Sequence, residues 1–379
     1  MKKALAIVLA LVMVLALCAC GGSSAPAAPA APAAPAAPAE PAAPAEPAAP
    51  AEPAATSPFE GMDTYELTFS THDPATSNNG KFLQAWADTI KEETEGHVDI
   101  TIYFSEALAS SKDVADLVEQ GGCDMGWVYT TFYPDRFPLS DITSFPFLGF
   151  GEPTSTTNTL WDLYEKYPEL QDEWSAYKVL MLYGNPGMLF ASTKGPVDCP
   201  DAVKNQVMRS PTGPITDFMN AVGGSPTVMG PPDIFDSIQK GVISGFVFEP
   251  AGITNFSLQD AATMWYTDYA MYDGVFAYIM NWDTWNSLPA EIQAVFEANS
   301  LKEGSLAAAK DFGDAAETAK KVIEDAGNTW VTLTDEQIAA FQAVAEEVNA
   351  SWLQKYTEKT GIDYAAYAAD AVATLAQYK

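Results

Sequence analysis

The chain is 379 residues long, 48% hydrophobic and 12% aromatic, a composition that fits a globular protein with large packed cores. Its formal net charge of −31 argues against a nucleic-acid partner, because phosphate binding needs a basic face. Only two of its nineteen basic residues are arginines, Arg136 and Arg209. Since surface positive charge is otherwise made of lysine, each arginine marks either a bidentate carboxylate site or a structural ion pair.

The N-terminus has the pattern of a bacterial export signal. A basic start is followed by an apolar run over 4–17, too short for a comfortable membrane span. The ending at 17–20 resembles a lipobox, which implies a lipoprotein signal peptide over 1–19, cleavage before Cys20 and diacylation of the Cys20 thiol. Plain signal-peptidase cleavage nearby is the alternative.

A proline-rich linker follows over 20–58. Proline occupies every third position from Pro26 to Pro53, and polyproline II has three residues per turn. The pattern predicts a semi-rigid spacer up to about 120 Å long, at about 3.1 Å per residue. A disordered tether without a set length is the other interpretation.

The next part of the chain alternates strand and helix patterns. The expected strands are 65–70, 98–104, 123–128 and 178–183. One expected helix ends at Gly96, and two others lie around 113–120 and 154–173. This alternation predicts βαβ units and a parallel sheet, whose ligands lie beyond the carboxyl ends of the strands. Those ends carry His72, Tyr129 and Thr130.

The stretch 206–250 reads as strand, helix, strand, helix, strand, with Arg209 at the end of its first strand. A nearly all-apolar strand, 275–280, follows. The pattern then turns helical, and a continuous helix over 289–326 would be about 57 Å long, enough to bridge two lobes. Gly304 and Gly313 allow a break in it. Two more helices are expected from about 334 and about 363.

Metal and redox chemistry have little support. Cys123 and Cys199 could form one disulfide, although their spacing does not show proximity. The two histidines, His72 and His97, have no metal-ligand spacing to any cysteine pair, so we expect neither a metal nor another cofactor.

Several stretches, taken together in order and spacing, resemble the solute-binding proteins of tripartite ATP-independent periplasmic (TRAP) transporters, of the C4-dicarboxylate-binding (DctP) type. The similarity runs from about 65 to 301. The matching stretches are 121–125, 133–139, 145–147, 205–209, 221–227, 238–245, 279–282 and 285–289.

The resemblance implies an α/β fold of the two-lobed periplasmic-binding-protein type (type II-like), with mixed sheets flanked by helices and a long helix spanning both lobes. The solute-binding domain would cover 59–379. We place lobe I at about 63–184 plus about 270–288, and lobe II at about 185–269 plus the C-terminal helices. The long helix would be the hinge, at about 289–326.

The resemblance also implies function. The protein would be an extracytoplasmic monomer, anchored to the cell membrane by lipid at Cys20, that captures an organic acid and delivers it to the TRAP membrane subunits. Arg209 matches the arginine with which the family pairs the ligand carboxylate, whereas Arg136 matches a loop where we expect a structural role. Other members carry a further arginine at 187–190, absent here, and a polar contact near Phe248. Both departures favour one carboxylate with a hydrophobic or aromatic remainder.

Five further ligand contacts are proposed from strand-end position, with packing or capping as the alternative for each: His72, Tyr129, Thr130, Phe248 and Glu249. Glu249 would repel a carboxylate and could instead bind an ammonium, a hydroxyl or a metal ion.

Two other functions compete. A sensor of the same fold would share the binding chemistry and differ only in its partner. A secreted hydrolase is disfavoured, because neither a Gly-x-Ser-x-Gly motif nor a metal-binding histidine pair occurs. We therefore predict a binding protein and not an enzyme.

Overall fold

The computed structural model describes residues 57–133 and 135–379. The predicted signal peptide, Cys20 and nearly all of the proline-rich linker lie outside the described residues. In the ranges that are described, no helix combines the length and the apolar character needed to cross a membrane.

The first lobe is built on a five-stranded sheet in the order β2-β1-β3-β10-β4. Its strands are β1 (Tyr65–Ser70), β2 (Val98–Tyr103), β3 (Met125–Tyr129), β4 (Lys178–Gly184) and β10 (Val275–Met280). The predicted parallel pairing is confirmed for β2, β1 and β3. Strand β10 arrives from much later in the chain and inserts antiparallel between β3 and β4, so the sheet is mixed. Every residue of β10 is buried, as its apolar sequence predicts.

Four helices accompany this sheet: α1 (Asn78–Glu93), α2 (Val114–Glu119), α3 (Pro153–Lys166) and α4 (Pro168–Glu173). The sequence predicted one helix over 154–173, and this prediction is wrong. The helix ends before Pro168, because a proline disfavours helical geometry at the residue before it, and Tyr167 is extended there.

The second lobe is built on a six-stranded sheet in the order β11-β9-β5-β8-β6-β7. Its strands are β5 (Leu189–Ser192), β6 (Val207–Ser210), β7 (Ser225–Val228), β8 (Gly245–Phe248), β9 (Trp265–Thr267) and β11 (Thr329–Val331), with helices α5 (Pro214–Ala221), α6 (Ile234–Gln239) and α7 (Pro250–Asn255). The order predicted for 206–250 is confirmed as β6-α5-β7-α6-β8. Strand β6 lies parallel to both β7 and β8, whereas β5 is antiparallel to β8 and β9.

Two of the chain segments that cross between the lobes run side by side, one from β4 to β5 and one from β9 to β10. They are bonded to each other along their length. The Met188 amide donates to the Tyr272 carbonyl (2.8 Å), and the Asn185 amide donates to the Gly274 carbonyl (3.2 Å). The Asn185 side-chain oxygen accepts a further bond from the Gly274 amide (2.6 Å). The crossing is therefore a two-stranded ribbon.

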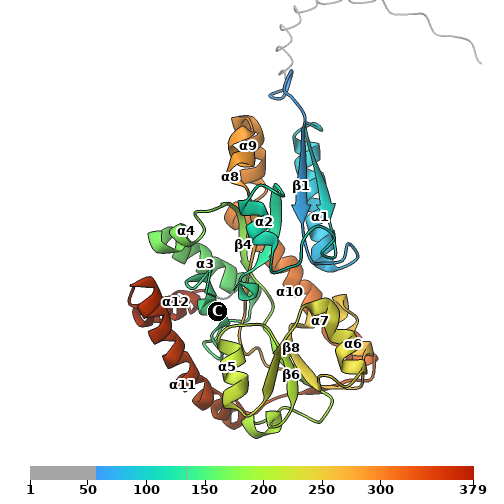
Figure 1. Ribbon diagram of the computed structural model, residues 1–379, viewed down its shortest axis with the longest axis vertical. Coiled ribbons are helices and arrows are strands. Elements are labelled where there is room, and N and C mark those ends of the chain that lie inside the picture. Colours follow the sequence, from blue (N-terminus) through green and yellow to red (C-terminus); the bar gives the residue numbers. More distant parts are fainter. Residues whose placement is uncertain (1–56, 134) are drawn as a thin grey trace, which may run out of the picture. The chain divides into compact units, whose positions relative to one another are not determined.

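The predicted helix over 289–326 is two helices, α9 (Ala290–Ala298) and α10 (Leu301–Asp325). The break falls at Asn299, whose carbonyl accepts a hydrogen bond from Trp86 Nε1 (3.0 Å), and Leu301 has a positive φ of 50°. Gly304 lies inside α10, where a Cβ would sit 2.7 Å from the Asn299 carbonyl oxygen. Helix α10 is about 37 Å long. It contacts α3 and β4 in the first lobe and α7 in the second, so a lobe-spanning helix is confirmed (Figure 1).

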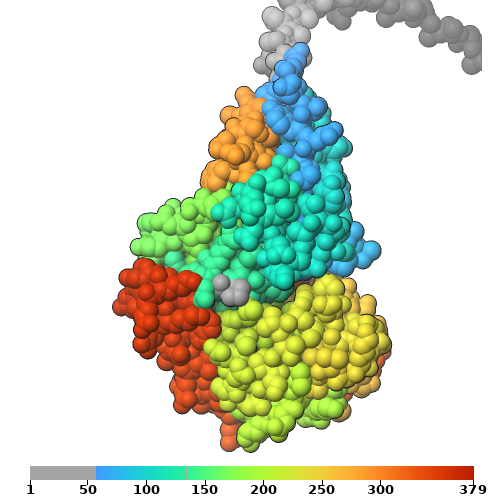
Figure 2. All heavy atoms as spheres, viewed as in Figure 1, coloured from blue at the N-terminus to red at the C-terminus, as the bar shows by residue number. Residues whose placement is uncertain are grey.

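The C-terminal helices are divided between the lobes. Helix α11 (Asp335–Thr360) begins with a capping box between Thr334 and Gln337 and packs on α5 of the second lobe. Helix α12 (Tyr364–Leu375), expected with the second lobe, packs on α3 of the first. Both helices, red in Figure 2, cover one side of the two lobes.

Candidate ligand-binding site

Arg209 lies near the end of β6, the strand between β7 and β8, and is only 1% exposed. Its Nε donates to the Met229 carbonyl (3.1 Å) and its Nη1 to the Val247 carbonyl (3.0 Å). Burial lowers its pKa, and no carboxylate within 57–133 or 135–379 forms an ion pair with it. Arg209 is therefore a buried cation whose counterion the described chain does not supply.

A small cavity of about 20 Å³ lies beside this arginine, between the lobes. That volume holds about one water molecule, so a ligand enters only when the lobes open and side chains move. Its wall is mostly aromatic. The lining residues are His72, Asp73, Asn79, Trp127, Tyr129, Phe132, Met188, Pro231, Phe248, Glu249, Gly252, Asn255, Phe256, Phe276 and Phe312.

Four of the residues proposed from the sequence therefore line one cavity: His72, Tyr129, Phe248 and Glu249. Arg209 lies at its edge, with its Cζ 5.0 Å from the centre of the Phe248 ring. Thr130 is buried but is not among the lining residues. Five of the six predicted positions therefore lie in or beside one cavity.

Two tyrosines interact electrostatically with Arg209. Tyr129 and Tyr272 are buried, and neither hydroxyl has a hydrogen-bond partner among the described residues. Burial raises the pKa of both, while the charge of Arg209 acts against that rise. Both hydroxyls therefore keep their protons and can donate. A guanidinium with two uncommitted hydroxyl donors suits a carboxylate. The sequence did not single out Tyr272, which lies in the ribbon between the lobes.

His72 is a neutral part of the wall. Its ring stacks on Trp127, with 4.8 Å between ring centres, and meets Phe132 edge-on. Burial lowers the pKa of His72 to about 4, and the charge of Arg209 adds to that effect. At neutral pH the imidazole therefore carries no charge and leaves Arg209 as the cation of the site.

Two carboxyl groups also face the cavity. Burial raises the pKa of Asp73 to about 7 and that of Glu249 to about 8, with Asp73 adding to the rise at Glu249. The repulsion that we expected between Glu249 and a carboxylate ligand is thereby reduced. Glu249 also caps α7, because its Oε2 accepts a hydrogen bond from the Gly252 amide (2.8 Å).

The cleft is held shut by hydrogen bonds from lobe to lobe. The Asn255 side-chain amide on α7 donates to the Asn78 side-chain oxygen on α1 (2.7 Å). The Asn78 backbone N–H donates to the Asn255 side-chain oxygen in return (3.4 Å). The Thr212 hydroxyl donates to the Thr131 carbonyl. Because these bonds are few and polar, they can exchange with water when the lobes part.

A larger hollow, of about 560 Å³, lies along α10. Gly151, Gly187, Lys310 and Lys320 are among its lining residues, and it contains neither Arg209 nor the aromatic wall. Its lysines pair with carboxylates of their own: Lys310 with Asp314, and Lys320 with Glu317 and Asp268. We therefore place the ligand-binding site in the smaller cavity, because Arg209 and the aromatic wall lie there and not at the larger hollow.

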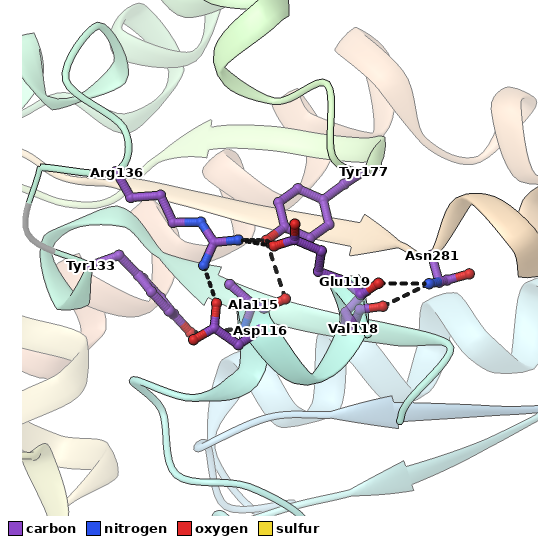
Figure 3. Close-up of polar contacts among 8 residues, drawn as sticks. All are labelled: Ala115, Asp116, Val118, Glu119, Tyr133, Arg136, Tyr177 and Asn281. Carbon is purple, nitrogen blue, oxygen red and sulfur yellow. Dashed lines mark hydrogen bonds and ion pairs between the residues drawn. The ribbon is translucent and has the colours of Figure 1, made fainter. Parts of the chain in front are cut away.

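Arg136 has a different role. Its guanidinium pairs with Asp116 and Glu119 of α2 and donates to the Tyr177 hydroxyl (Figure 3). Tyr177, just before β4, in turn donates to the Ala115 carbonyl (3.1 Å), so Arg136 and Tyr177 together tie the loop after β3 and the start of β4 to α2. The structural role expected for Arg136 is confirmed.

Cys123 and Cys199 are free thiols, so they do not form the disulfide that the sequence left open. Throughout the described ranges, no group of three or more His, Cys, Asp or Glu side chains is arranged to hold a metal ion.

Residues 69–356 match the family described as bacterial extracellular solute-binding protein, family 7 (DctP). A solute-binding protein of Chromohalobacter salexigens is 25% identical over 174 residues, 45% of this chain and 51% of that protein, so the match spans about half of that relative.

Two solved structures have the same fold. One is a TRAP periplasmic solute-binding protein of Bordetella bronchiseptica with bound (R)- and (S)-mandelate, at 26% identity and a TM-score of 0.75, covering 83% of this chain and 100% of that one. The other is a marine-metagenome TRAP protein specific for aromatic acids, with 3-hydroxybenzoate, at 23% identity and a TM-score of 0.79, covering 84% and 99%. Since the family match covers most of the chain, this protein belongs to the bacterial extracellular solute-binding proteins of family 7, which bind solutes for transporters and are not enzymes.

Proposed function

We propose that this protein is the extracytoplasmic binding component of a TRAP transporter and that its ligand is an aromatic monocarboxylate. The observation that carries the proposal is Arg209, a buried cation without a carboxylate partner in the described chain, at the edge of an aromatic cavity. Mandelate and 3-hydroxybenzoate, bound by the two structural relatives, are acids of this kind.

The binding cycle follows from the closed cleft. In the open form the ligand carboxylate meets Arg209 of the second lobe, and closing adds the hydroxyls of Tyr129 and Tyr272. Closing then places the ring against Phe248 of the second lobe and against Trp127 and other aromatic residues of the first. Burial in a dry cavity strengthens the ion pair and excludes ligands that lack the charge. Opening at the membrane subunits would release the acid.

Binding measured by calorimetry tests this. We expect benzoate, phenylacetate and mandelate to bind with dissociation constants in the micromolar range or below, and benzamide, which has the same shape without the charge, to bind at least about 100-fold more weakly. Succinate, a dicarboxylate without a ring, is the matched control for the aromatic part. Equal affinity for succinate and benzoate would contradict the aromatic assignment, and equal affinity for benzamide would contradict the carboxylate assignment.

We further propose that Cys20 carries the lipid anchor and that the proline-rich linker holds the binding domain away from the membrane. The support is the sequence pattern around 17–20 and the proline repeat. In cells fed a labelled fatty acid, the wild-type chain should incorporate label and fractionate with membranes, whereas Cys20→Ala should do neither. Label retained in the variant would place the anchor elsewhere.

A further inference from the structure

Asp73 and Glu249 come from opposite lobes and meet at one cavity. Asp73 follows β1 in the first lobe, and Glu249 follows β8 in the second. Both side chains line the cavity and are buried, at 2% and 4% exposure. Within the described chain neither forms an ion pair with Lys, Arg or His, so a cation of the protein does not explain their burial.

Each carboxyl group has one oxygen in a hydrogen bond and one without. Glu249 Oε2 accepts from the Gly252 amide (2.8 Å), and Asp73 Oδ2 accepts weakly from the Asn79 side chain (3.4 Å). Among the hydrogen bonds of the described residues, none reaches Glu249 Oε1 or Asp73 Oδ1. The Ala251 amide acts with the Gly252 amide against the rise that burial causes in the pKa of Glu249. The nearby Ser77 hydroxyl is already committed, because it donates to the Pro74 carbonyl (2.8 Å). Two acceptor oxygens therefore remain for a partner from outside the protein.

The cavity has two kinds of charged or titratable group around it, the cation Arg209 at its edge and the carboxyl groups of Asp73 and Glu249 in its wall. The charge of Arg209 acts on His72, Tyr129 and Tyr272. Asp73 raises the pKa of Glu249. The amides of Asn79 and Asn255, from α1 and α7, line the same cavity.

This arrangement suits a ligand with two polar ends. A carboxylate would occupy the Arg209 end, and the aromatic wall would hold the ring. A ring with an apolar far end would seal both acceptor oxygens away from water without a donor, and an unsatisfied buried polar group is unfavourable. A hydroxyl or an ammonium group at that end supplies the missing donor.

We propose that Asp73 and Glu249 form a second subsite that selects aromatic acids bearing a hydrogen-bond donor, a hydroxyl or an ammonium group, on the side of the ring away from the carboxylate. The inference rests on the proposed function and narrows it. It makes the two carboxyl groups determinants of specificity, whereas Arg209 determines the class of ligand.

Matched ligands measure the effect by calorimetry. Each of 3- and 4-hydroxybenzoate and 3- and 4-aminomethylbenzoate is compared with the methylbenzoate substituted at the same position, which has no donor. We expect at least one donor-bearing acid to bind the wild-type protein at least about tenfold more tightly than its methyl analogue. Methyl analogues that bind as tightly as all four donor-bearing acids would overturn the inference and leave the proposed function intact. If no aromatic acid binds, both are overturned.

Variants assign the preference to the carboxyl groups. In Glu249→Met, which removes the acceptor at similar size, the preference should fall below about threefold while the affinity for the methyl analogue is kept or improved. A gain for the methyl analogue would not result from misfolding. A preference that survives in both Glu249→Met and Asp73→Leu would overturn the assignment.

The conservative changes Glu249→Gln and Asp73→Asn separate the two donors. Both keep an acceptor oxygen but cannot become anionic, so a hydroxyl ligand should lose less than about threefold and an ammonium ligand about tenfold or more. A small loss would indicate that the subsite binds a hydroxyl group, and a large loss that it binds an ammonium group; both results support the subsite. Glu152→Met is the control, because Glu152 also caps a helix, accepting from the Ser155 amide (2.6 Å), but lies outside this cavity. It should leave the ligand preference unchanged.

Discussion

The two arginines of this chain are surrounded by opposite environments. Arg136 lies at the surface of the first lobe, with a side chain 27% exposed, and pairs with two carboxylates and a tyrosine hydroxyl. Arg209 is buried in the second lobe and donates only to two backbone carbonyls of the described chain. Because a guanidinium in a protein remains charged, the difference lies in where the counterion comes from. An arginine that the protein neutralises supports the fold, and one left for a ligand defines a site.

Replacing Arg209 should have the largest effect. In Arg209→Met the affinity for an aromatic acid should fall at least about 100-fold, because the ligand carboxylate would be buried without a partner. Without ligand, Tm should stay within about 3 °C of wild type, since removing an unpaired buried charge offsets the two lost hydrogen bonds. Calorimetry and thermal unfolding measure these quantities. A large fall in ligand-free Tm would make Arg209 structural, like Arg136.

Replacing Arg136 should lower stability and leave ligand affinity nearly unchanged, the reverse of replacing Arg209. Arg136→Met should lower the free energy of unfolding by about 1–2 kcal/mol and Tm by about 2–5 °C, because Asp116, Glu119 and the Tyr177 hydroxyl lose their shared donor. Ligand affinity should stay within about twofold. Lys91→Met is the control, since the Lys91–Asp99 pair is well exposed and should contribute little. A loss of affinity without a loss of stability would contradict the assignment of Arg136 as a structural residue.

Asn255 tests whether closing the cleft contributes to binding at Arg209. Asn255→Ala removes both hydrogen bonds to Asn78 across the lobes, so the closed form should be less favoured. We expect about three- to tenfold weaker binding, mostly through faster ligand dissociation in stopped-flow measurements. The ion pairs of Arg136 should not change in this variant, and Tm without ligand should change little. Unchanged dissociation would mean that these bonds do not hold the cleft shut.

The smallest expected effect is on the pH dependence of stability. It comes from two carboxyl groups that are buried without forming an ion pair in the described chain. Burial raises the pKa of Asp273 to about 8 and that of Asp141 to about 7, and each has one oxygen without a partner in the described chain. Folding therefore binds protons between about pH 4 and pH 8, and the free energy of unfolding falls as pH rises through that window. Tm should be at least about 2 °C lower at about pH 8.5 than at about pH 5.5. Asp273→Asn should flatten this dependence, and a Tm that rises with pH would contradict it.

Local pattern was enough to predict most of the fold. Periodicity placed nearly all strands and helices of the two sheets, and rarity together with position singled out Arg209. Strands β9 and β11 were not predicted, because three residues are too short to show a period. The break at Asn299 depends on Trp86, more than two hundred positions away, which no local window contains.

The site was only partly predictable for the same reason. His72, Tyr129 and Phe248 lie at or near the ends of strands, so topology alone brings them to one edge. Tyr272 belongs to the ribbon between the lobes, and Asp73 acquires its significance only when the second lobe closes over it. Such contacts arise from tertiary packing, and neither composition nor spacing reveals them.

The ribbon between the lobes limits how they can move. Two separate strands could twist independently, but here the Met188 and Asn185 amides bind the neighbouring strand at Tyr272 and Gly274, so both strands must bend together. Helix α10, in contact with both lobes, opposes rotation about the ribbon axis. We therefore expect opening to be mainly a bend of this ribbon. The change in distance between one label on each lobe, with and without ligand, would measure it.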